Sequence, residues 1–422
     1  MDGYYAFMLV ATALVLMMTV PALALFYGGM TRSKSVLNMM MMSFGAFGIA
    51  TLVFVLWGWS EGWGNLGNGD LISNPFTLFG LKDVEWSSYI GMAFQLTFAA
   101  ITAALISGAV ADRVKFSSWM VFVPVWLTLC YLPIAHNVWG GGWLSEHWVA
   151  QDYAGGTVVH INAGVAGLVL ALVVGKRVGW PKEPMRPHNL TLTMIGAGLL
   201  WFGWYGFNVG SIVIADPKDS GAQFMSETGL TFLNTTVATM AAMLGWLLVE
   251  RLIHGKATSL GAASGIVAGL VAITPACGAV NQLGAICIGA IAGGLCAVAV
   301  GLKFKFGFDD SLDVVGVHLV GGLVGTVLIG LFSTHTAAGG IDGLFYGGGF
   351  GSLKVQVLAA LFTLIWTGVL TTVIALAIKH TIGWRITPEA EVEGIDYDQH
   401  GESAYDLHAA SASSAYLVTE GV

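Results

Sequence analysis

The sequence contains one pattern twice, first as Asp152-Tyr-Ala-Gly-Gly-Thr-Val-Val-His160-Ile-Asn-Ala-Gly164-Val-Ala-Gly167 and, 158 residues later, as Asp310-Ser-Leu-Asp313-Val-Val-Gly-Val-His318-Leu-Val-Gly-Gly322-Leu-Val-Gly325. Both stretches read Asp-x7-His-x3-Gly-x2-Gly. Each runs into a long apolar segment, which is typical of a span that crosses a membrane. The chain therefore contains two related halves, each with one histidine inside a candidate span.

The composition around these repeats is that of a membrane protein. Of the 422 residues, 56% are hydrophobic and 10% are charged, and the mean hydropathy is +0.76. An ordinary soluble domain has about 25% charged residues. The 58 glycines favour helices that pack closely against one another. These values exclude a soluble enzyme, a nucleic-acid binder and a disordered chain.

Eleven apolar segments are long enough to cross a hydrocarbon core of ~30 Å. The first begins without preceding basic residues, so we expect a retained span rather than a cleaved signal peptide. The eighth is interrupted by glycine, serine and Pro275. We predict an all-α polytopic membrane protein with eleven transmembrane helices near residues 4–27, 36–58, 88–110, 117–138, 155–175, 190–213, 229–250, 258–275, 282–302, 313–333 and 353–379.

Basic residues alternate from side to side along these spans. The loops after even-numbered spans hold only Lys82, Lys218 and Lys354. Lysine and arginine are retained on the cytoplasmic side, which predicts an outer N-terminus and a cytoplasmic C-terminus. The other fourteen bases follow odd-numbered spans, at Arg32, Lys34, Arg113, Lys115, Lys176, Arg177, Lys182, Arg186, Arg251, Lys256, Lys303, Lys305, Lys379 and Arg385.

Most of the net charge of −8 lies at the end of the chain. Residues 383–422 contain eight acidic residues and one basic residue, Arg385. We therefore predict a transmembrane domain over residues 1–382 and an acidic cytoplasmic tail over 383–422.

The two histidine patterns fall in the fifth and tenth spans. They divide the transmembrane domain into repeats of about 4–175 and 190–333, with the eleventh helix outside both. An odd number of spans per repeat gives the two halves opposite orientations, as in many transporters. Eight helical residues rise ~12 Å. His160 and His318 are thus expected near the midplane, close enough to be neighbours.

Histidines at this depth have three interpretations. They can hydrogen-bond between helices, line a pathway, or bind a metal. The symmetry of the pair favours a pathway, because an imidazole both donates and accepts a proton near neutral pH. The four cysteines lack metal-site spacing, so we predict no metal site. Asp152 and Asp313 lie at the mouths of their spans and are either helix caps or substrate contacts.

Aromatic residues gather near the predicted outer ends of spans three, four and six. Phe94, Trp139 and Ser211 are expected near the outer surface, and Phe98 and Phe207 one helical turn deeper. Aromatic faces and a hydroxyl can hold a small cation, and deeper rings can strip its water. Core packing is the alternative for each phenylalanine.

The predicted outer loops also carry five tryptophans. Tryptophan is enriched at the membrane–water interface. We expect an interfacial aromatic belt formed by Trp59, Trp63, Trp86, Trp143 and Trp148.

In its motifs the chain resembles the ammonium transporter family (Amt/MEP/Rh), most closely its bacterial Amt branch. The match extends from the first span to about Tyr405. The Trp139-Gly-Gly-Gly142 piece fits Amt proteins better than Rh proteins, which lack the complete aromatic site. The matching pieces are Ala24-Leu-Phe26-Tyr-Gly-Gly29, Phe94-Gln-x-x-Phe98-Ala, Ile134-Ala-His136-Asn-Val-Trp139-Gly-Gly-Gly142, Asp152 to Asn162, Trp204-Tyr-Gly-Phe207-Asn-x-Gly-Ser211, Thr274-Pro-Ala-Cys-Gly278, Asp313-Val-x-Gly-Val-His318 and His400-Gly-Glu-Ser-Ala-Tyr405.

The resemblance implies a homotrimer in the cell membrane, with one pore per subunit, no cofactor and no enzymatic activity. It implies a recruitment site for ammonium, or its analogue methylammonium, then a gate and a pore. Asp313 is assigned to the inner mouth, and a P-II-class signalling protein is an expected cytoplasmic partner. The matching residues are Phe94, Trp139 and Ser211, with Asp152 acting indirectly, for recruitment; Phe98 and Phe207 for the phenyl gate; and His160 and His318 for the pore.

The expected function is transport of ammonium, which is bound and desolvated outside, deprotonated, and conducted as NH3 with or without its proton. Sensing of ammonium for a cytoplasmic partner is the alternative. A K⁺ channel would need a carbonyl-rich filter, and the sequence shows none.

Overall fold

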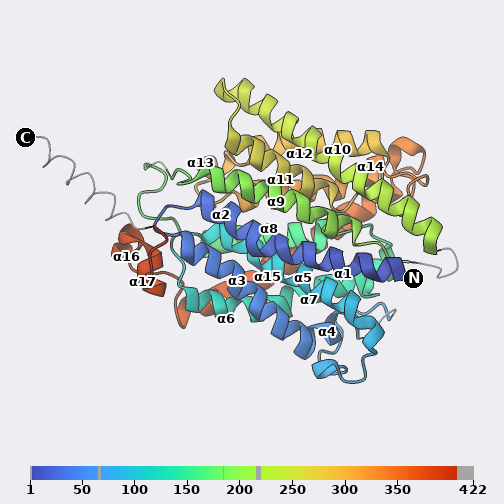
Figure 1. Ribbon diagram of the computed structural model, residues 1–422, viewed down its shortest axis with the longest axis horizontal. Helices are drawn as coiled ribbons and strands as arrows, with labels where there is room; N and C mark the ends of the chain where they lie inside the picture. Colours follow the sequence, from blue (N-terminus) through green and yellow to red (C-terminus); the bar gives the residue numbers. More distant parts are fainter. Residues whose placement is uncertain (1, 65–67, 184, 215–219, 406–422) are drawn as a thin grey trace, which may run out of the picture.

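The computed structural model describes residues 2–64, 68–183, 185–214 and 220–405 (Figure 1). Over these ranges the chain is helical and contains no strand, only two isolated bridges, Val114 with Arg385 and Val280 with Ser333. The long helices run roughly along the longest axis, with the N-terminus at one end and α16 and α17 at the other.

The α-helices are α1 (Asp2–Met17), α2 (Ala24–Met30), α3 (Val36–Val53), α4 (Trp59–Trp63), α5 (Tyr89–Ile106), α6 (Phe116–Trp126), α7 (Leu132–Trp139), α8 (Asn162–Val174), α9 (Leu190–Val209), α10 (Ser220–His254), α11 (Ser259–Ile273), α12 (Gln282–Ala299), α13 (Leu302–Phe306), α14 (Val320–Phe332), α15 (Gly351–His380), α16 (Pro388–Glu393) and α17 (Ile395–His400). Wider π-helical turns are η1 (Met18–Leu23), η2 (Phe54–Gly58), η6 (Leu127–Tyr131), η7 (Leu144–Trp148), η8 (Gly156–Ile161) and η9 (Val315–Leu319). Short 3₁₀ turns are η3 (Phe79–Leu81), η4 (Trp86–Ser88), η5 (Ser107–Val110) and η10 (Leu344–Tyr346).

Ten helical stretches within the described residues are long and apolar enough to cross a membrane. Each coincides with one predicted span. They are Gly3–Met30, Val36–Trp63, Trp86–Val110, Phe116–Trp148, Gly156–Val174, Leu190–Val209, Gly221–His254, Gln282–Phe306, Val315–Phe332 and Gly351–His380.

The predicted eighth span corresponds to α11, which is shorter. Its 15 residues rise about 22 Å at 1.5 Å each. Thr258 caps its start by accepting a hydrogen bond from the Gly261 N–H, and Pro275 follows its end. Nearly every residue of α11 is buried, because the helix packs between α9, α10, α12 and α14.

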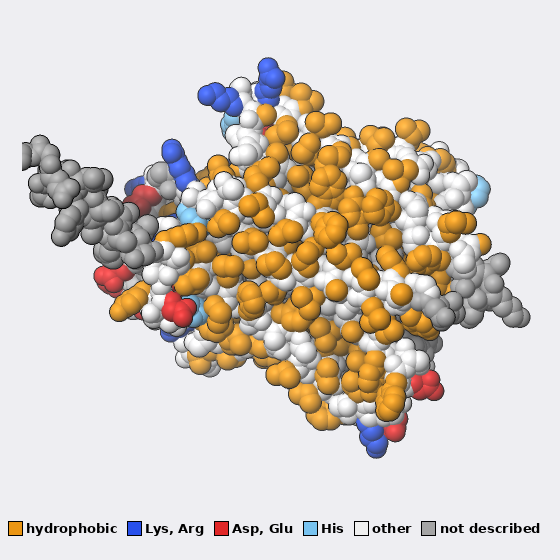
Figure 2. All heavy atoms as spheres, viewed as in Figure 1, with side chains coloured by type: hydrophobic (Ala, Val, Ile, Leu, Met, Phe, Trp, Pro, Cys, Tyr) orange, Lys and Arg blue, Asp and Glu red, His pale blue; other side chains and the backbone are white. Residues whose placement is uncertain are grey.

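The surface shows how the chain sits in a bilayer. Figure 2 shows hydrophobic side chains covering the middle of the molecule, with charged side chains confined to its two ends. An apolar band between charged ends is what a lipid-embedded protein requires. Together with the ten apolar helices, it identifies a multi-pass membrane protein.

The repeated histidine patterns build the same element twice. In each copy a π-helical turn carrying the histidine leads into a helix of 13 residues, η8 into α8 and η9 into α14. The packing is reciprocal, since α8 contacts η9 and α14 contacts η8. A Cβ on Gly164 would lie 2.5 Å from the Leu319 nitrogen, and one on Gly322 would lie 3.1 Å from the Ile161 nitrogen. The paired glycines thus let the two elements cross at backbone contact.

This close crossing gives a stability prediction. Gly164→Ala is expected to destabilise the protein by about 1–3 kcal/mol, because the new methyl group overlaps backbone that cannot turn away. The measurement is thermal unfolding of the detergent-solubilised protein. Gly198→Ala is the matched control, because a Cβ there meets nothing within 4 Å and alanine favours the helix. Equal loss of stability in both variants would contradict the backbone contact between the two elements at Gly164.

The described part of the predicted acidic tail, 383–405, folds back onto the end of the bundle opposite the N-terminus. Trp384 is buried and donates to the Ala375 carbonyl at 2.8 Å. The carboxylate of Asp396 accepts from the Leu37 and Asn38 N–H groups, at 3.0 and 2.8 Å, and so caps the start of α3. The predicted tail residues 406–422 lie outside the described part of the chain.

Candidate functional site

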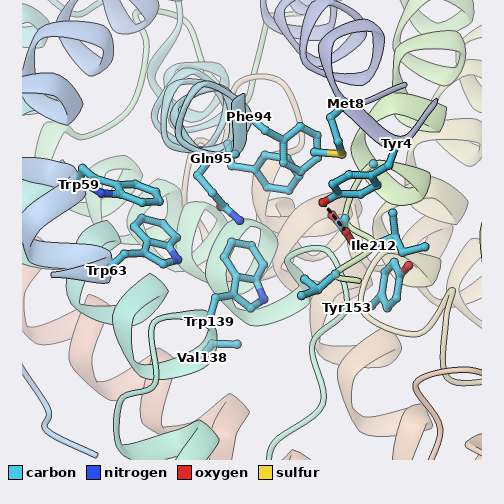
Figure 3. Close-up of a pocket in the computed structure, with 15 residues that line it drawn as sticks. Tyr4, Met8, Trp59, Trp63, Phe94, Gln95, Val138, Trp139, Tyr153 and Ile212 are labelled. Carbon is cyan, nitrogen blue, oxygen red and sulfur yellow. Dashed lines mark hydrogen bonds between the residues drawn. The ribbon is translucent and has the colours of Figure 1, made fainter. Parts of the chain in front are cut away.

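A cavity of about 480 Å³ opens at the end of the bundle that holds the N-terminus, and Tyr4 and Met8 form part of its lining. Figure 3 shows aromatic rings on several sides of it, contributed by segments distant in the sequence. Four of the predicted site residues, Phe94, Phe98, Trp139 and Ser211, line this cavity. The complete lining is Tyr4, Met8, Trp59, Trp63, Gly91, Phe94, Gln95, Phe98, Val138, Trp139, Tyr153, Gly210, Ser211, Ile212 and Val213.

Local hydrogen bonds hold the polar members of the cavity wall in place. Trp139 ends α7 and donates its indole N–H to the Asp152 carbonyl at 2.8 Å. Ser211 follows α9 and donates to the Phe207 carbonyl at 2.8 Å, which leaves the lone pairs of its hydroxyl available. A fixed indole face beside a hydroxyl acceptor is a suitable environment for a small cation.

Sequence reasoning missed several lining residues. Tyr4, Met8, Gln95 and Tyr153 contribute to the wall (Figure 3) and carry no periodic signal that marks them. Trp59 and Trp63, expected only in an interfacial belt, also line the cavity, with their rings stacked at 5.1 Å and an interplanar angle of 13°. Their spacing of four residues, one helical turn, is the signal that could have found them.

Two phenylalanines close the floor of the cavity. The rings of Phe98 and Phe207 stack with centroids 4.0 Å apart and an interplanar angle of 10°. Both side chains are almost completely buried. Phe94 lies above, 4.8 Å from Phe98, and Trp139 meets Phe98 edge to face at 5.8 Å. The two rings therefore form a stacked apolar pair between the cavity, which Phe98 lines, and His160, whose ring lies 6.3 Å from Phe207.

The two histidines lie together beneath this floor. Their Nδ1 atoms are 3.3 Å apart and their ring centroids 5.4 Å apart. The His160 ring also stacks on Trp204 at 5.5 Å and lies 6.3 Å from Phe207. Both imidazoles are buried, and His160 Nε2 has no hydrogen-bond partner.

The Nδ1–Nδ1 contact restricts how the neutral pair can be protonated. One Nδ1 must donate and the other must accept, so one ring carries its proton on Nδ1 and the other on Nε2. The pair consequently presents one N–H donor and one bare nitrogen at its two Nε2 positions. A hydrogen-bonded pair of this kind can take up a proton at one Nε2 atom and release one from the other.

Buried aspartates set the position of both histidine turns. The Asp152 carboxylate accepts from the N–H groups of Gly155, Gly156, Thr157 and Val158, and from the Thr157 hydroxyl. Asp152 therefore caps η8, which is one of the two roles that the sequence allows for it, a helix cap or a substrate contact.

In the second repeat the corresponding cap is Asp310. Its carboxylate accepts from the Val314 and Val315 N–H groups at 3.0 and 2.7 Å. Asp313 lies beside it with φ +63° and pairs with Lys303 at 2.6 Å. The repeat pattern aligns Asp310 with Asp152, and this alignment is the sequence signal for its role.

Charged side chains join the end of α8 to the segment before η9. Arg177, which follows α8, binds Asp112 and Asp309 at 2.9 Å each. Buried Arg113 donates to the Asp309 carbonyl and to the Ser311 hydroxyl. Burial disfavours the charge of Asp309, but the hydrogen bonds and positive charge of Arg177 outweigh it, so the pKa of Asp309 lies below its ordinary value.

Among the described residues, no three His, Cys, Asp or Glu side chains gather closely enough to hold an ion. The four cysteines are free thiols, and three of them are buried. Two histidines alone supply too few ligands for a structural or catalytic zinc site.

Comparisons with known proteins find similar sequences along nearly the whole chain. The family model described as Ammonium Transporter Family matches residues 6–405. An ammonium transporter of Mycobacterium tuberculosis (strain ATCC 25618 / H37Rv) is 53% identical, over 97% of this chain and 92% of the relative. One from Aquifex aeolicus is 48% identical, over 96% and 94%.

Solved structures resemble the fold as well. A structure titled Sensor Amt Protein covers 94% of this chain and 98% of its own length, with 28% identity and a TM-score of 0.85. Candida albicans Mep2 covers 96% and 93%, with 31% identity and a TM-score of 0.85.

Proposed function

Because this chain belongs to the ammonium transporter family, we propose that it recruits ammonium at the outer cavity and conducts it as NH3 past the histidine pair. The observation that carries this proposal is the order of the three groups. An aromatic cavity lies above a stacked phenyl pair, and a buried histidine pair lies beneath it.

The first step is capture of NH4⁺ in the cavity. The face of Trp139 attracts the cation through its ring quadrupole, and the Ser211 hydroxyl accepts one of its four N–H groups. Contacts of this kind contribute about 0.5–2 kcal/mol, more as water is excluded. Weak capture suits a transport protein, because the substrate must also leave.

Passage through the phenyl pair requires loss of charge. Ammonium is stabilised in water, and carrying it as a bare ion between two apolar rings costs several kcal/mol. Neutral NH3 avoids most of that cost. K⁺, similar in size, has no proton to give up, so the same apolar passage excludes it.

The histidine pair gives NH3 a polar partner in an otherwise apolar passage. The bare Nε2 accepts an N–H from the substrate and the protonated one donates to its lone pair. The pair is also the candidate route for the proton, whose transfer would make transport electrogenic.

The surrounding architecture extends the proposal. We take α11 as an eleventh crossing, with the N-terminus outside and the tail in the cytoplasm, because the basic residues gather in the alternate loops. A homotrimer in the cell membrane, and docking of a P-II-class protein on its inner face, rest on the family resemblance alone.

The decisive experiment applies an ammonium pulse to proteoliposomes that contain the purified protein. We expect a saturable current with ammonium, a smaller one with methylammonium, and none with an equal pulse of K⁺. Equal currents with ammonium and K⁺ would identify a general cation channel instead.

A sensing role is the second candidate. It is favoured by the likeness to the structure titled Sensor Amt Protein. Saturable ammonium binding with neither current nor uptake in the same proteoliposomes would replace the transport proposal with this one.

A further inference from the structure

A buried carboxylate lies directly behind the outer cavity. Glu227, in the first turns of α10, is only 6% exposed. It accepts a hydrogen bond from the Tyr153 hydroxyl at 2.7 Å and another from the Gln223 amide at 3.0 Å. Tyr153 itself lines the cavity, so the carboxylate is one hydrogen bond away from the space assigned to ammonium.

Tyr153 is held rigidly between the carboxylate and the cavity. Its backbone N–H donates to the Pro275 carbonyl at 3.1 Å. Its ring packs against Gly278, where a Cβ would come within 2.5 Å of the ring atom Cδ2. Figure 3 shows the ring on the side of the cavity opposite Trp59 and Trp63.

Among the described residues, no basic side chain neutralises the charge of Glu227, since no lysine, arginine or histidine forms an ion pair with it. Asp152, another carboxylate near the cavity, is turned into η8 and bound by backbone N–H groups. Glu227 is thus positioned to project its negative potential toward the cavity.

We propose that Glu227, acting through Tyr153, sets the affinity of the outer cavity for its cation. This inference rests on the proposed function and adds a specificity-determining pair to it. The carboxylate attracts the cation through the low-dielectric wall. It also polarises the phenol that donates to it, which makes the ring more electron-rich and strengthens its cation–π attraction.

The test compares the ammonium concentration that gives half-maximal current in wild-type and Glu227→Gln proteoliposomes. Glutamine keeps the size of the side chain and an acceptor for Tyr153 but removes the charge. At a charge separation of about 8 Å in a medium of intermediate dielectric, we expect that concentration to rise about fivefold. The maximal current should stay within about twofold.

Salt dependence separates an electrostatic role from a structural one. The wild-type half-maximal concentration should rise with added sodium chloride more steeply than that of the variant, because the salt screens a charge that the variant lacks. Glu227→Asp, which keeps the charge, should recover most of the affinity. Glu85→Gln removes an equal charge from an exposed position in the loop before α5 and should have no effect.

Tyr153→Phe provides an independent variant. It removes the hydroxyl that links the carboxylate to the cavity, and the half-maximal concentration should rise about twofold, within the range of one lost hydrogen bond. Wild-type affinity in both Glu227→Gln and Tyr153→Phe, with normal wild-type currents, would overturn the inference. Absence of ammonium current in the wild type would instead overturn the proposed function.

Discussion

Replacing both His160 and His318 by leucine is expected to lower the ammonium-evoked current at least tenfold. The two imidazoles are the polar groups of the proposed passage, and they lie beside the rings of Phe207 and Trp204. A hydrogen bond between neutral groups contributes about 1 kcal/mol, and NH3 makes two with the pair in the proposed mechanism, so losing both corresponds to roughly thirtyfold in rate. The measurement is the peak current in proteoliposomes, normalised to the amount of folded protein.

The two single variants sharpen this prediction. Because the Nδ1 atoms bond to each other, removing one ring leaves the other with an unpaired buried nitrogen. Each single leucine variant is therefore expected to lose nearly as much current as the double variant. His335→Leu is the control, since this histidine has a side chain 74% exposed in a loop and pairs with Asp342. Unchanged current and unchanged K⁺ exclusion in the double variant would contradict a role for the pair.

The proximity of the two histidines could be predicted because it follows from their spacing within the two repeats. Each lies eight residues after an aspartate that begins its span, and the two spans enter from opposite sides. The repeat therefore fixes the depth of each histidine without any knowledge of tertiary contacts. The reciprocal glycines, Gly164 and Gly322, belong to the same repeated pattern and serve the same crossing.

Other parts of the site depend on contacts that have no local signal. Glu227 accepts a hydrogen bond from Tyr153, a cavity residue 74 positions earlier in the sequence, only because α10 packs beside the segment that carries Tyr153. The docking of Asp396 on the start of α3 joins residues 358 positions apart. Charge counting correctly marks this tail as acidic, but it cannot show which carboxylates are used as caps. The π-helical turns are likewise absent from any periodic pattern, because one extra residue in a turn leaves the apolar composition unchanged.

Asp152→Ala is expected to have the second large effect, on both stability and current. The variant leaves the N–H groups of Gly155, Gly156 and Thr157 buried without their acceptor. Each unsatisfied group costs about 1–3 kcal/mol, so a total loss of about 3 kcal/mol or more is expected after partial relaxation. The turn that these bonds hold carries His160 three residues later, and the current per folded protein should fall about tenfold or more as that imidazole leaves its partner.

Asp313→Ala is the control variant for Asp152→Ala. It also removes an aspartate at the mouth of a span, but this aspartate pairs with Lys303 instead of capping a histidine turn. Asp313 is partly exposed and forms an ion pair with Lys303, and such a pair contributes about 1 kcal/mol or less. Its removal should lower the thermal unfolding temperature slightly and leave most of the current. Asp152→Asn should fall between the two, because one carbonyl oxygen still accepts while the amide hydrogens face donors. If Asp152→Ala unfolds at the same temperature as Asp313→Ala, the carboxylate does not hold the histidine turn, and its contribution to transport must lie in direct contact with the cation.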